Sequence, residues 1–243
     1  MMGRAGKVLT EALGPVTDFI YPPRCPACGA GIGGQNGLCL DCWGSLEVPD
    51  TAAANPGEVI AATIYCDVSR KLILAFKHGR KFALAPLLGR LIAARLGEPL
   101  PDRLIVPVPL HPLRLWQRGY NQSALLACEL ARLGHGTLLV DGLRRVRHTP
   151  SLDRRSAQQR DALLAGAIDA SPKRRCLIEG RDILLIDDVL TSGATTRACT
   201  AALRQGGAST VSIACFARVR PASSARHDVT GTDARDLVIP GVA

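Results

Sequence analysis

The sequence predicts an α/β fold, in which a parallel sheet is flanked by helices and preceded by a small N-terminal module. Beyond residue 58, short and continuously apolar runs alternate with helical patterns, as in parallel sheets that are covered on both faces. Four cysteines gather within residues 25–42, before that alternation begins. Hydrophobic residues make up 47% of the 243 positions and charged residues 21%, so disorder over most of the chain is excluded.

The elements are predicted from the spacing of apolar residues and from their end signals. An amphipathic helix is expected over residues 6–20, and a linker rich in Pro, Ala, Asn and Gly over 49–57. The expected strands are 59–66, 104–108, 137–140, 182–186 and 210–218. The expected helices are 69–78, 83–96, 122–133 and 195–205, and residues 144–160 are expected to be irregular. The domains are then an N-terminal helix and cysteine module over 1–50, an α/β domain over 55–220, and a disordered tail over 221–243.

The chain contains no run of about 18 uncharged apolar residues, so no membrane-spanning helix is expected. Its first residues lack the apolar run and the small-residue cleavage site of a secretory signal, and we expect a cytoplasmic protein. The 30 Lys and Arg outnumber the 21 Asp and Glu, which suggests an anionic partner: nucleic acid, a phosphorylated small molecule or an acidic protein. An Arg-rich surface without such a partner is the alternative.

One basic stretch suggests contact with nucleic acid. Residues 141–181 contain ten Lys or Arg and five acids. Contacts between such a stretch and phosphates would be sensitive to salt. The stretch has no interleaved aromatic residues on which single-stranded bases could stack, so only weak, non-specific binding is expected.

The four clustered cysteines have the spacing of a structural zinc site, Cys25-x2-Cys28-x10-Cys39-x2-Cys42. Two residues between cysteines allow a tight knuckle to aim both sulfurs at one ion, and two knuckles complete a tetrahedron. Disulfides are disfavoured in a chain without an export signal, and an iron–sulfur cluster is a further alternative. Because all four ligands come from the protein, the zinc would be structural rather than catalytic.

Residues 183–196 combine a buried strand, two acids and a hydroxyl-rich loop that opens a helix. Asp187 and Asp188 are expected where the strand ends, which is where ligands bind in open α/β sheets. The following loop offers backbone N–H groups to a phosphate, and Gly193 permits close approach. The hydroxyls expected to add donors are those of Thr191, Ser192, Thr195 and Thr196. A ribose 5-phosphate fits both halves, whereas an ordinary strand–turn–helix is the structural alternative.

A second polar segment follows the predicted strand over 104–108. Its prolines, Pro107 and Pro109, stiffen the loop and remove N–H groups. Arg114 and Arg118 come next and could neutralise a diphosphate with forked hydrogen bonds. Solvated arginines on an edge loop are the alternative.

The segment from Ile183 to Thr195 closely resembles the 5-phosphoribosyl 1-diphosphate (PRPP) signature of type I phosphoribosyltransferases. The resemblance implies that Asp187 and Asp188 are the catalytic pair and bind the ribose hydroxyls, while the loop binds the 5-phosphate. The PRPP-binding set that it implies is Asp187, Asp188, Val189, Leu190, Thr191, Ser192, Gly193, Ala194 and Thr195. It also implies Mg2+, held largely by the diphosphate and the ribose.

The layout over residues 15–220 resembles the ComF family of competence proteins. The segments that carry the resemblance are the two cysteine pairs, Phe76-Lys77-His78-Gly79, Val106-Pro107-Val108-Pro109-Leu110, Arg118-Gly119-Tyr120-Asn121-Gln122 and the PRPP signature. The diphosphate side that it implies consists of Val108, Pro109, Leu110, Arg114 and Arg118. Leu152 and Leu163 depart from the family, which commonly has Gln and Asn there.

The resemblance implies a phosphoribosyltransferase that moves a 5-phosphoribosyl group from PRPP to an unknown acceptor. Positioning and electrostatics would supply most of the catalysis, because charge builds on the ribose and on the departing diphosphate. The alternative is a non-catalytic DNA-uptake or regulatory factor that keeps the fold and its phosphate site.

Overall fold

The computed structural model describes residues 22–34, 37–49, 59–78, 81–147, 159, 163–164 and 166–220. The predicted helix over 6–20, the predicted tail over 221–243 and all of the predicted linker except Pro49 lie outside these residues. So do Leu152 and three arginines of the basic stretch, namely Arg154, Arg155 and Arg160.

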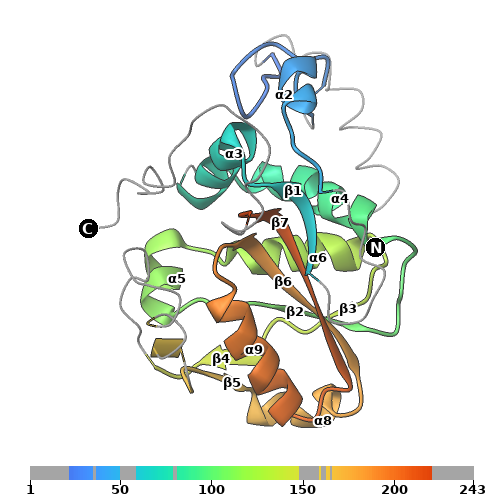
Figure 1. Ribbon diagram of the computed structural model, residues 1–243, viewed down its shortest axis with the longest axis vertical. Coiled ribbons are helices and arrows are strands. Elements are labelled where there is room, and N and C mark those ends of the chain that lie inside the picture. The colour runs from blue at the N-terminus through green and yellow to red at the C-terminus, as the bar shows by residue number, and fades with distance from the viewer. Residues whose placement is uncertain are drawn as a thin grey trace, which may run out of the picture.

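The core of the molecule is one sheet of five parallel strands, in the order β1-β7-β6-β2-β3 (Figure 1). The strands are β1 (Val59–Ile64), β2 (Leu104–Pro107), β3 (Thr137–Leu138), β6 (Asp182–Leu190) and β7 (Thr210–Arg218). The long ladder between β6 and β7 runs from the pair Asp182 and Thr210 to the pair Leu190 and Arg218. The predicted α/β class is therefore confirmed.

Helices cover both faces of this sheet. The longer helices are α3 (Asp67–His78), α4 (Ala85–Leu96), α5 (Pro112–Arg118), α6 (Gln122–Arg132) and α9 (Ala194–Gln205). Alternate side chains of β6 enter different cores: Leu184 and Ile186 pack in the cluster that includes α4 and α6. Ile183 and Leu185 pack with α9 in the other cluster, as the two-residue period of a strand requires.

The cysteine module shares the first of these cores. Cys25, Leu38 and Cys42 are buried in the same apolar cluster as Leu72 of α3 and Leu87 of α4. The described part of the module carries one short helix, α2 (Leu40–Gly44), which lies at the top of Figure 1 above α3 and α4. Loss of order in the module would therefore expose apolar side chains of the α/β domain. None of the described helices is long and apolar enough to cross a membrane.

Two predictions about secondary structure were wrong near the site. The strand predicted to end at Ile186 continues to Leu190, because the backbone of β6 keeps its pairing with β7 at Asp187, Val189 and Leu190. A proline-stiffened loop is expected after β2, with an edge loop of solvated arginines as the alternative, yet Pro112–Arg118 forms the helix α5. His111 caps that helix by accepting from the Leu113 amide at 3.2 Å, and Gly119 ends it in the left-handed conformation.

The stretch predicted to be irregular begins in a small second sheet. Here β4 (Leu143–Arg145) pairs antiparallel with β5 (Ile168–Ala170), beside α9. The 3-10 helix η2 (Pro172–Arg174) and α8 (Arg175–Ile178) then lead into β6. A second 3-10 helix, η1 (Phe82–Leu84), precedes α4. The small sheet was missed because a three-residue strand carries too few side chains to show a period.

Candidate functional site and metal centre

The two acids of the predicted site lie near the carboxyl end of β6, next to the end of β2. The Val108 amide donates to the Ile186 carbonyl at 2.9 Å, so the proline segment begins beside Asp187. The loop 191–193 and α9 follow directly. The structure therefore brings three predicted parts together: the acid pair, the loop and the start of the proline segment.

Asp187 is held by hydrogen bonds to one of its carboxylate oxygens. Its Oδ1 accepts from the Asp188 amide at 2.8 Å and from the Ser123 hydroxyl at 3.3 Å. Burial and the neighbouring charge of Asp188 raise the pKa of Asp187 to about 7, although Lys77 and the hydrogen bonds oppose the shift. Asp187 therefore binds a proton more tightly than an ordinary aspartate.

Asp188 forms an ion pair with a residue that the sequence interpretation had not assigned to the site. The Lys77 ammonium, at the end of α3, lies 3.0 Å from Asp188 Oδ2. Both side chains are largely enclosed, with 19% of Lys77 and 13% of Asp188 exposed. The signal in the sequence was the segment Phe76-Lys77-His78-Gly79, which carries part of the resemblance to the ComF family.

The loop between β6 and α9 has the backbone shape of an anion-binding turn. Gly193 takes the left-handed conformation with φ of +73° and precedes the first turn of α9. The first amides of a helix have no acceptor within the helix and can donate to a phosphate. The Arg197 side chain donates to the Ser192 carbonyl at 2.7 Å, which braces the loop from α9.

One predicted donor of the loop is committed elsewhere. Thr196 is 2% exposed, and its hydroxyl donates to the Gly193 carbonyl at 2.9 Å. The expectation that Thr196 offers its hydroxyl to a phosphate was therefore wrong. Thr191 is exposed, and Ser192 and Thr195 are half-buried.

The predicted diphosphate side is built on the segment from β2 to α6. Val108, Pro109 and Leu110 follow β2, and Arg114 and Arg118 lie on α5. The Asn121 amide group donates to the Val108 carbonyl at 2.9 Å, and Arg118 donates to Gln122 Oε1 at 3.3 Å. A further guanidinium, Arg145 of β4, is near Arg114: burial and then the Arg114 charge lower its pKa. This side of the site is therefore rich in positive charge.

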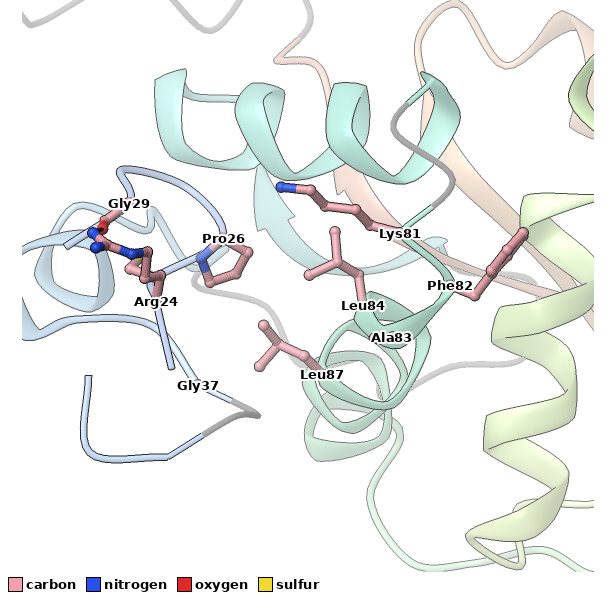
Figure 2. A pocket seen from close by; sticks show the side chains of 10 residues that line it. Arg24, Pro26, Gly29, Gly37, Lys81, Phe82, Ala83, Leu84 and Leu87 are labelled. Atoms are coloured by element: carbon pink, nitrogen blue, oxygen red, sulfur yellow. Dashed lines mark hydrogen bonds between the residues drawn. The ribbon is translucent and has the colours of Figure 1, made fainter. Parts of the chain in front are cut away.

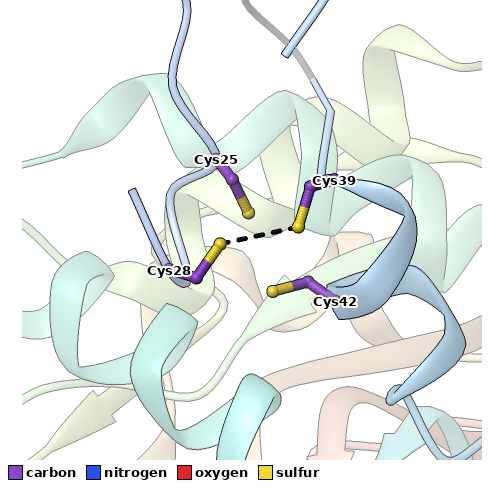
Figure 3. A group of neighbouring side chains, drawn as sticks. All are labelled: Cys25, Cys28, Cys39 and Cys42. Atoms are coloured by element: carbon purple, nitrogen blue, oxygen red, sulfur yellow. Dashed lines mark hydrogen bonds between the residues drawn. The ribbon is translucent and has the colours of Figure 1, made fainter. Parts of the chain in front are cut away.

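The four predicted metal ligands converge on one point (Figure 3). The Sγ atoms of Cys25, Cys28, Cys39 and Cys42 all lie within 4.8 Å of one another, and those of Cys28 and Cys39 are 3.5 Å apart. Four sulfurs around one zinc ion, each about 2.3 Å from it, would be separated by about 3.8 Å. The cluster therefore has the size of a tetrahedral zinc site.

The environment favours the thiolate at Cys25, whereas burial and the neighbouring cysteines raise the pKa of Cys42. Burial raises the pKa of Cys25, but hydrogen bonds from the backbone of Cys39, Cys28 and Ala27 outweigh it and lower the pKa to about 6. Thiolate is the form of cysteine that binds zinc. The four-cysteine set thus supports structural Zn2+, with each of the four cysteines as one ligand.

A cavity of about 520 Å³ separates the cysteine module from the start of α4 (Figure 2). Pro26, Leu84 and Leu87 form an apolar part of its lining, and the cationic side chains of Arg24 and Lys81 also line it. In Figure 2, Phe82 points away from this group toward α6. Its ring there makes an edge contact with Tyr120, with 4.5 Å between centroids. No motif in the sequence indicated this cavity.

Comparison with known proteins identifies both parts of the chain. Residues 131–234 match the family model of a phosphoribosyl transferase domain, and residues 16–67 match that of a double zinc ribbon domain. Among the described residues of the second range, only one four-cysteine group gathers, so the chain offers one zinc site there. The glutamine PRPP amidotransferase from B. subtilis has a TM-score of 0.40 at 17% identity, over 67% of this chain and 32% of that one.

Curated relatives match over most of their length. The DNA utilization protein YhgH of Escherichia coli (strain K12) is 30% identical over 201 residues, which is 80% of this chain and 83% of that protein. Competence protein F of Haemophilus influenzae is 32% identical over 202 residues, or 81% of this chain and 85% of that protein. With these relatives, and with a phosphoribosyltransferase-like domain behind a zinc module, the chain belongs to the ComF family.

Proposed function

We propose that this chain binds PRPP together with Mg2+ and transfers its 5-phosphoribosyl group to an acceptor, with release of diphosphate. The observation that carries the proposal is the junction of β6 and α9. There, two acids, Asp187 and Asp188, directly precede a loop with a left-handed glycine at a helix start. A ligand that carries both hydroxyls and a phosphate matches this junction, because acids repel a phosphate but accept from hydroxyls.

The parts of PRPP are assigned to different parts of the site. The ribose hydroxyls donate to Asp187 and Asp188, and the loop from Thr191 to Thr195 holds the 5-phosphate. The diphosphate lies along Val108, Pro109 and Leu110, where Arg114 and Arg118 offset its charge. When the diphosphate leaves, these fixed cations stabilise the developing negative charge without reorganisation.

Mg2+ suits this assignment with little help from the protein. The oxygen donors beside the proposed ribose that suit Mg2+ are the carboxylates of Asp187 and Asp188. One oxygen of Asp188 already forms an ion pair with Lys77. We therefore assign most of the coordination to the diphosphate and ribose oxygens, with these two acids nearby. Bound there, Mg2+ would neutralise charge on the leaving diphosphate.

Release of diphosphate from PRPP tests the proposed reaction. The wild-type protein is incubated with PRPP, Mg2+ and a panel of nucleobases and related acceptors, and diphosphate is measured. We expect one acceptor class to give turnover that the double variant Asp187→Asn, Asp188→Asn loses. Equal diphosphate release by the wild type and this variant, with every acceptor, would contradict a catalytic role for the pair.

A second function, binding of single-stranded nucleic acid, is favoured by the surface of α5. Trp116 is 84% exposed, and Arg114 and Arg118 lie two positions before and after it in the same helix, on the opposite side. A base could stack on the exposed indole while the guanidinium groups contact phosphates. The relatives named for DNA utilization and competence are consistent with this proposal. The aromatic platform missing from residues 141–181 would come from α5 instead.

A further inference from the structure

Each acid of the candidate site has its own partner from a different helix. Ser123, in the first turn of α6, donates to Asp187 Oδ1 at 3.3 Å. Lys77, at the end of α3, lies 3.0 Å from Asp188 Oδ2. No hydrogen bond or ion pair within the described part of the chain engages the second oxygens, Asp187 Oδ2 and Asp188 Oδ1. The pair therefore presents two acceptor oxygens while its other two are held by the protein.

The backbone next to Lys77 is held in place. Its neighbour Phe76 is 1% exposed in the main core, and the Tyr120 hydroxyl donates to the Phe76 carbonyl. The Tyr120 ring also packs near that of Phe76, with 6.2 Å between centroids. The end of α3 is thus fastened to the segment that leads into α6, the helix that carries Ser123.

The ion pair changes what the two acids can bind. Two adjacent carboxylates without a counter-ion attract a divalent cation, and their mutual repulsion disfavours charge on both. The Lys77 ammonium already neutralises the charge of Asp188, so the pair attracts an external cation less strongly. The acceptors that remain are then better suited to neutral hydroxyl donors than to a second cation.

We propose that Lys77 is a positioning residue that fixes Asp188 as the acceptor for one hydroxyl of a vicinal diol, while Ser123 fixes Asp187 for the other. This inference rests on the proposed function, and it adds the two residues that hold the acid pair ready for the ribose hydroxyls. A ribose 5-phosphate offers both hydroxyls, whereas a 2-deoxyribose 5-phosphate offers one. Discrimination between these two sugars would depend on Lys77, although its ion pair in the described part of the chain is with Asp188 and not with the phosphate loop.

Calorimetric titration of the full chain with three probes tests this role. The probes are ribose 5-phosphate, 2-deoxyribose 5-phosphate and inorganic phosphate. We expect the wild type to prefer ribose 5-phosphate over its deoxy analogue by about tenfold, the value of one hydrogen bond to a charged group. Lys77→Met and Lys77→Gln should lose most of that preference and keep the affinity for inorganic phosphate. Lys77→Arg, which keeps the charge, should restore part of it.

Lys71→Met is the matched control, because Lys71 lies on the same helix with an exposed side chain. Thermal unfolding of each variant shows whether it is folded. If folded Lys77→Met or Lys77→Gln discriminates between the sugars like the wild type, the role of Lys77 is wrong and the proposed function stands. If the wild type binds neither sugar phosphate, the proposed function fails and this inference falls with it.

Discussion

Ser123 Oγ donates to Asp187 Oδ1 at 3.3 Å, and the Ser123 amide donates to Asn121 Oδ1 at 3.0 Å. The Asn121 side chain in turn donates to the Val108 carbonyl. The start of α6 therefore connects the acid pair with the segment proposed to hold the diphosphate. Both halves of the site rest on this one helix start, which is one reason why they keep a fixed relative position.

Asp187 should make the stability of the fold depend on pH. Its pKa is raised from 3.8 to about 7, so the folded state holds a proton that the unfolded state releases in that interval. The stabilisation is fully present below about pH 4 and is lost as the pH rises through about 7. We expect the melting temperature of the wild type to fall between about pH 5 and about pH 8 by a few degrees more than that of Asp187→Asn. If the melting temperatures of the two proteins change with pH in parallel, Asp187 is ionised in the folded state.

Gly193 should be required for phosphate binding. It has φ of +73°, and an added Cβ would lie 3.0 Å from the Arg197 guanidinium that braces the loop. Gly193→Val should therefore weaken inorganic phosphate and ribose 5-phosphate together, by about tenfold for one lost hydrogen bond to a charged group. Titration calorimetry measures both affinities.

Gly180→Val is the matched control for backbone strain. Gly180 also has a positive φ, +68°, but an added Cβ there meets no atom within 4 Å. We expect it to lower the melting temperature and leave phosphate affinity unchanged. Loss of phosphate affinity in Gly180→Val as large as in Gly193→Val would mean that strain in general, and not the loop, is responsible.

The cysteine module should release its zinc when one ligand is removed, and the whole fold should lose stability. Cys28→Ser leaves three thiolates, which do not close a structural tetrahedron. Because Cys25, Leu38 and Cys42 belong to the main core, the loss of zinc should lower the melting temperature of the α/β domain as well. Elemental analysis and thermal unfolding measure the two effects.

Cys66→Ser provides the comparison for this experiment. Cys66 lies in the range that matches the zinc ribbon model, but its thiol is directed to the Ser45 carbonyl, at 3.6 Å, and it is outside the four-cysteine group. The Cys66→Ser protein should therefore keep one equivalent of zinc. A zinc content of zero in the wild type, or iron in its place, would refute the zinc assignment.

Trp116 should contribute to binding of single-stranded DNA. Stacking of one base on an aromatic side chain is worth about 1–3 kcal/mol, so Trp116→Ala should weaken binding by roughly fivefold or more. Trp43→Ala is the control, since Trp43 is the only other tryptophan and lies on α2. Fluorescence anisotropy with a labelled oligonucleotide, at low and physiological salt, measures both. Equal affinity of the two variants would remove α5 as the contact.

The parallel sheet and the zinc module were predictable because their signals are local. Continuous apolar runs marked the buried strands, and the cysteine spacing marked the knuckles. The bounds of β7 were predicted correctly, and those of α9 differed by one residue. The end of β6 was not predictable in this way, since two acids interrupt its apolar run and the residues beyond Ile186 are held by pairing with β7.

The contacts around the acid pair could not be predicted from local patterns. Lys77 meets Asp188 only because α3 and β6, far apart in the sequence, lie together in the fold. The opposite error occurred at Thr196, where the composition indicated a donor for a ligand but the hydroxyl closes the first turn of α9. The helix α5 had usable signals, Pro112 and the left-handed Gly119, which the prolines and arginines around them obscured.

Binding of PRPP by the Asp187–Thr195 turn is the central claim, and titration calorimetry with PRPP and millimolar Mg2+ tests it most directly. The wild type should bind PRPP. Asp187→Asn and Asp188→Asn should each lose roughly tenfold or more in affinity for PRPP, and lose less for inorganic phosphate, because they remove acceptors for the ribose hydroxyls only. No binding of PRPP by the wild type, or unchanged binding by both folded variants, would contradict the claim.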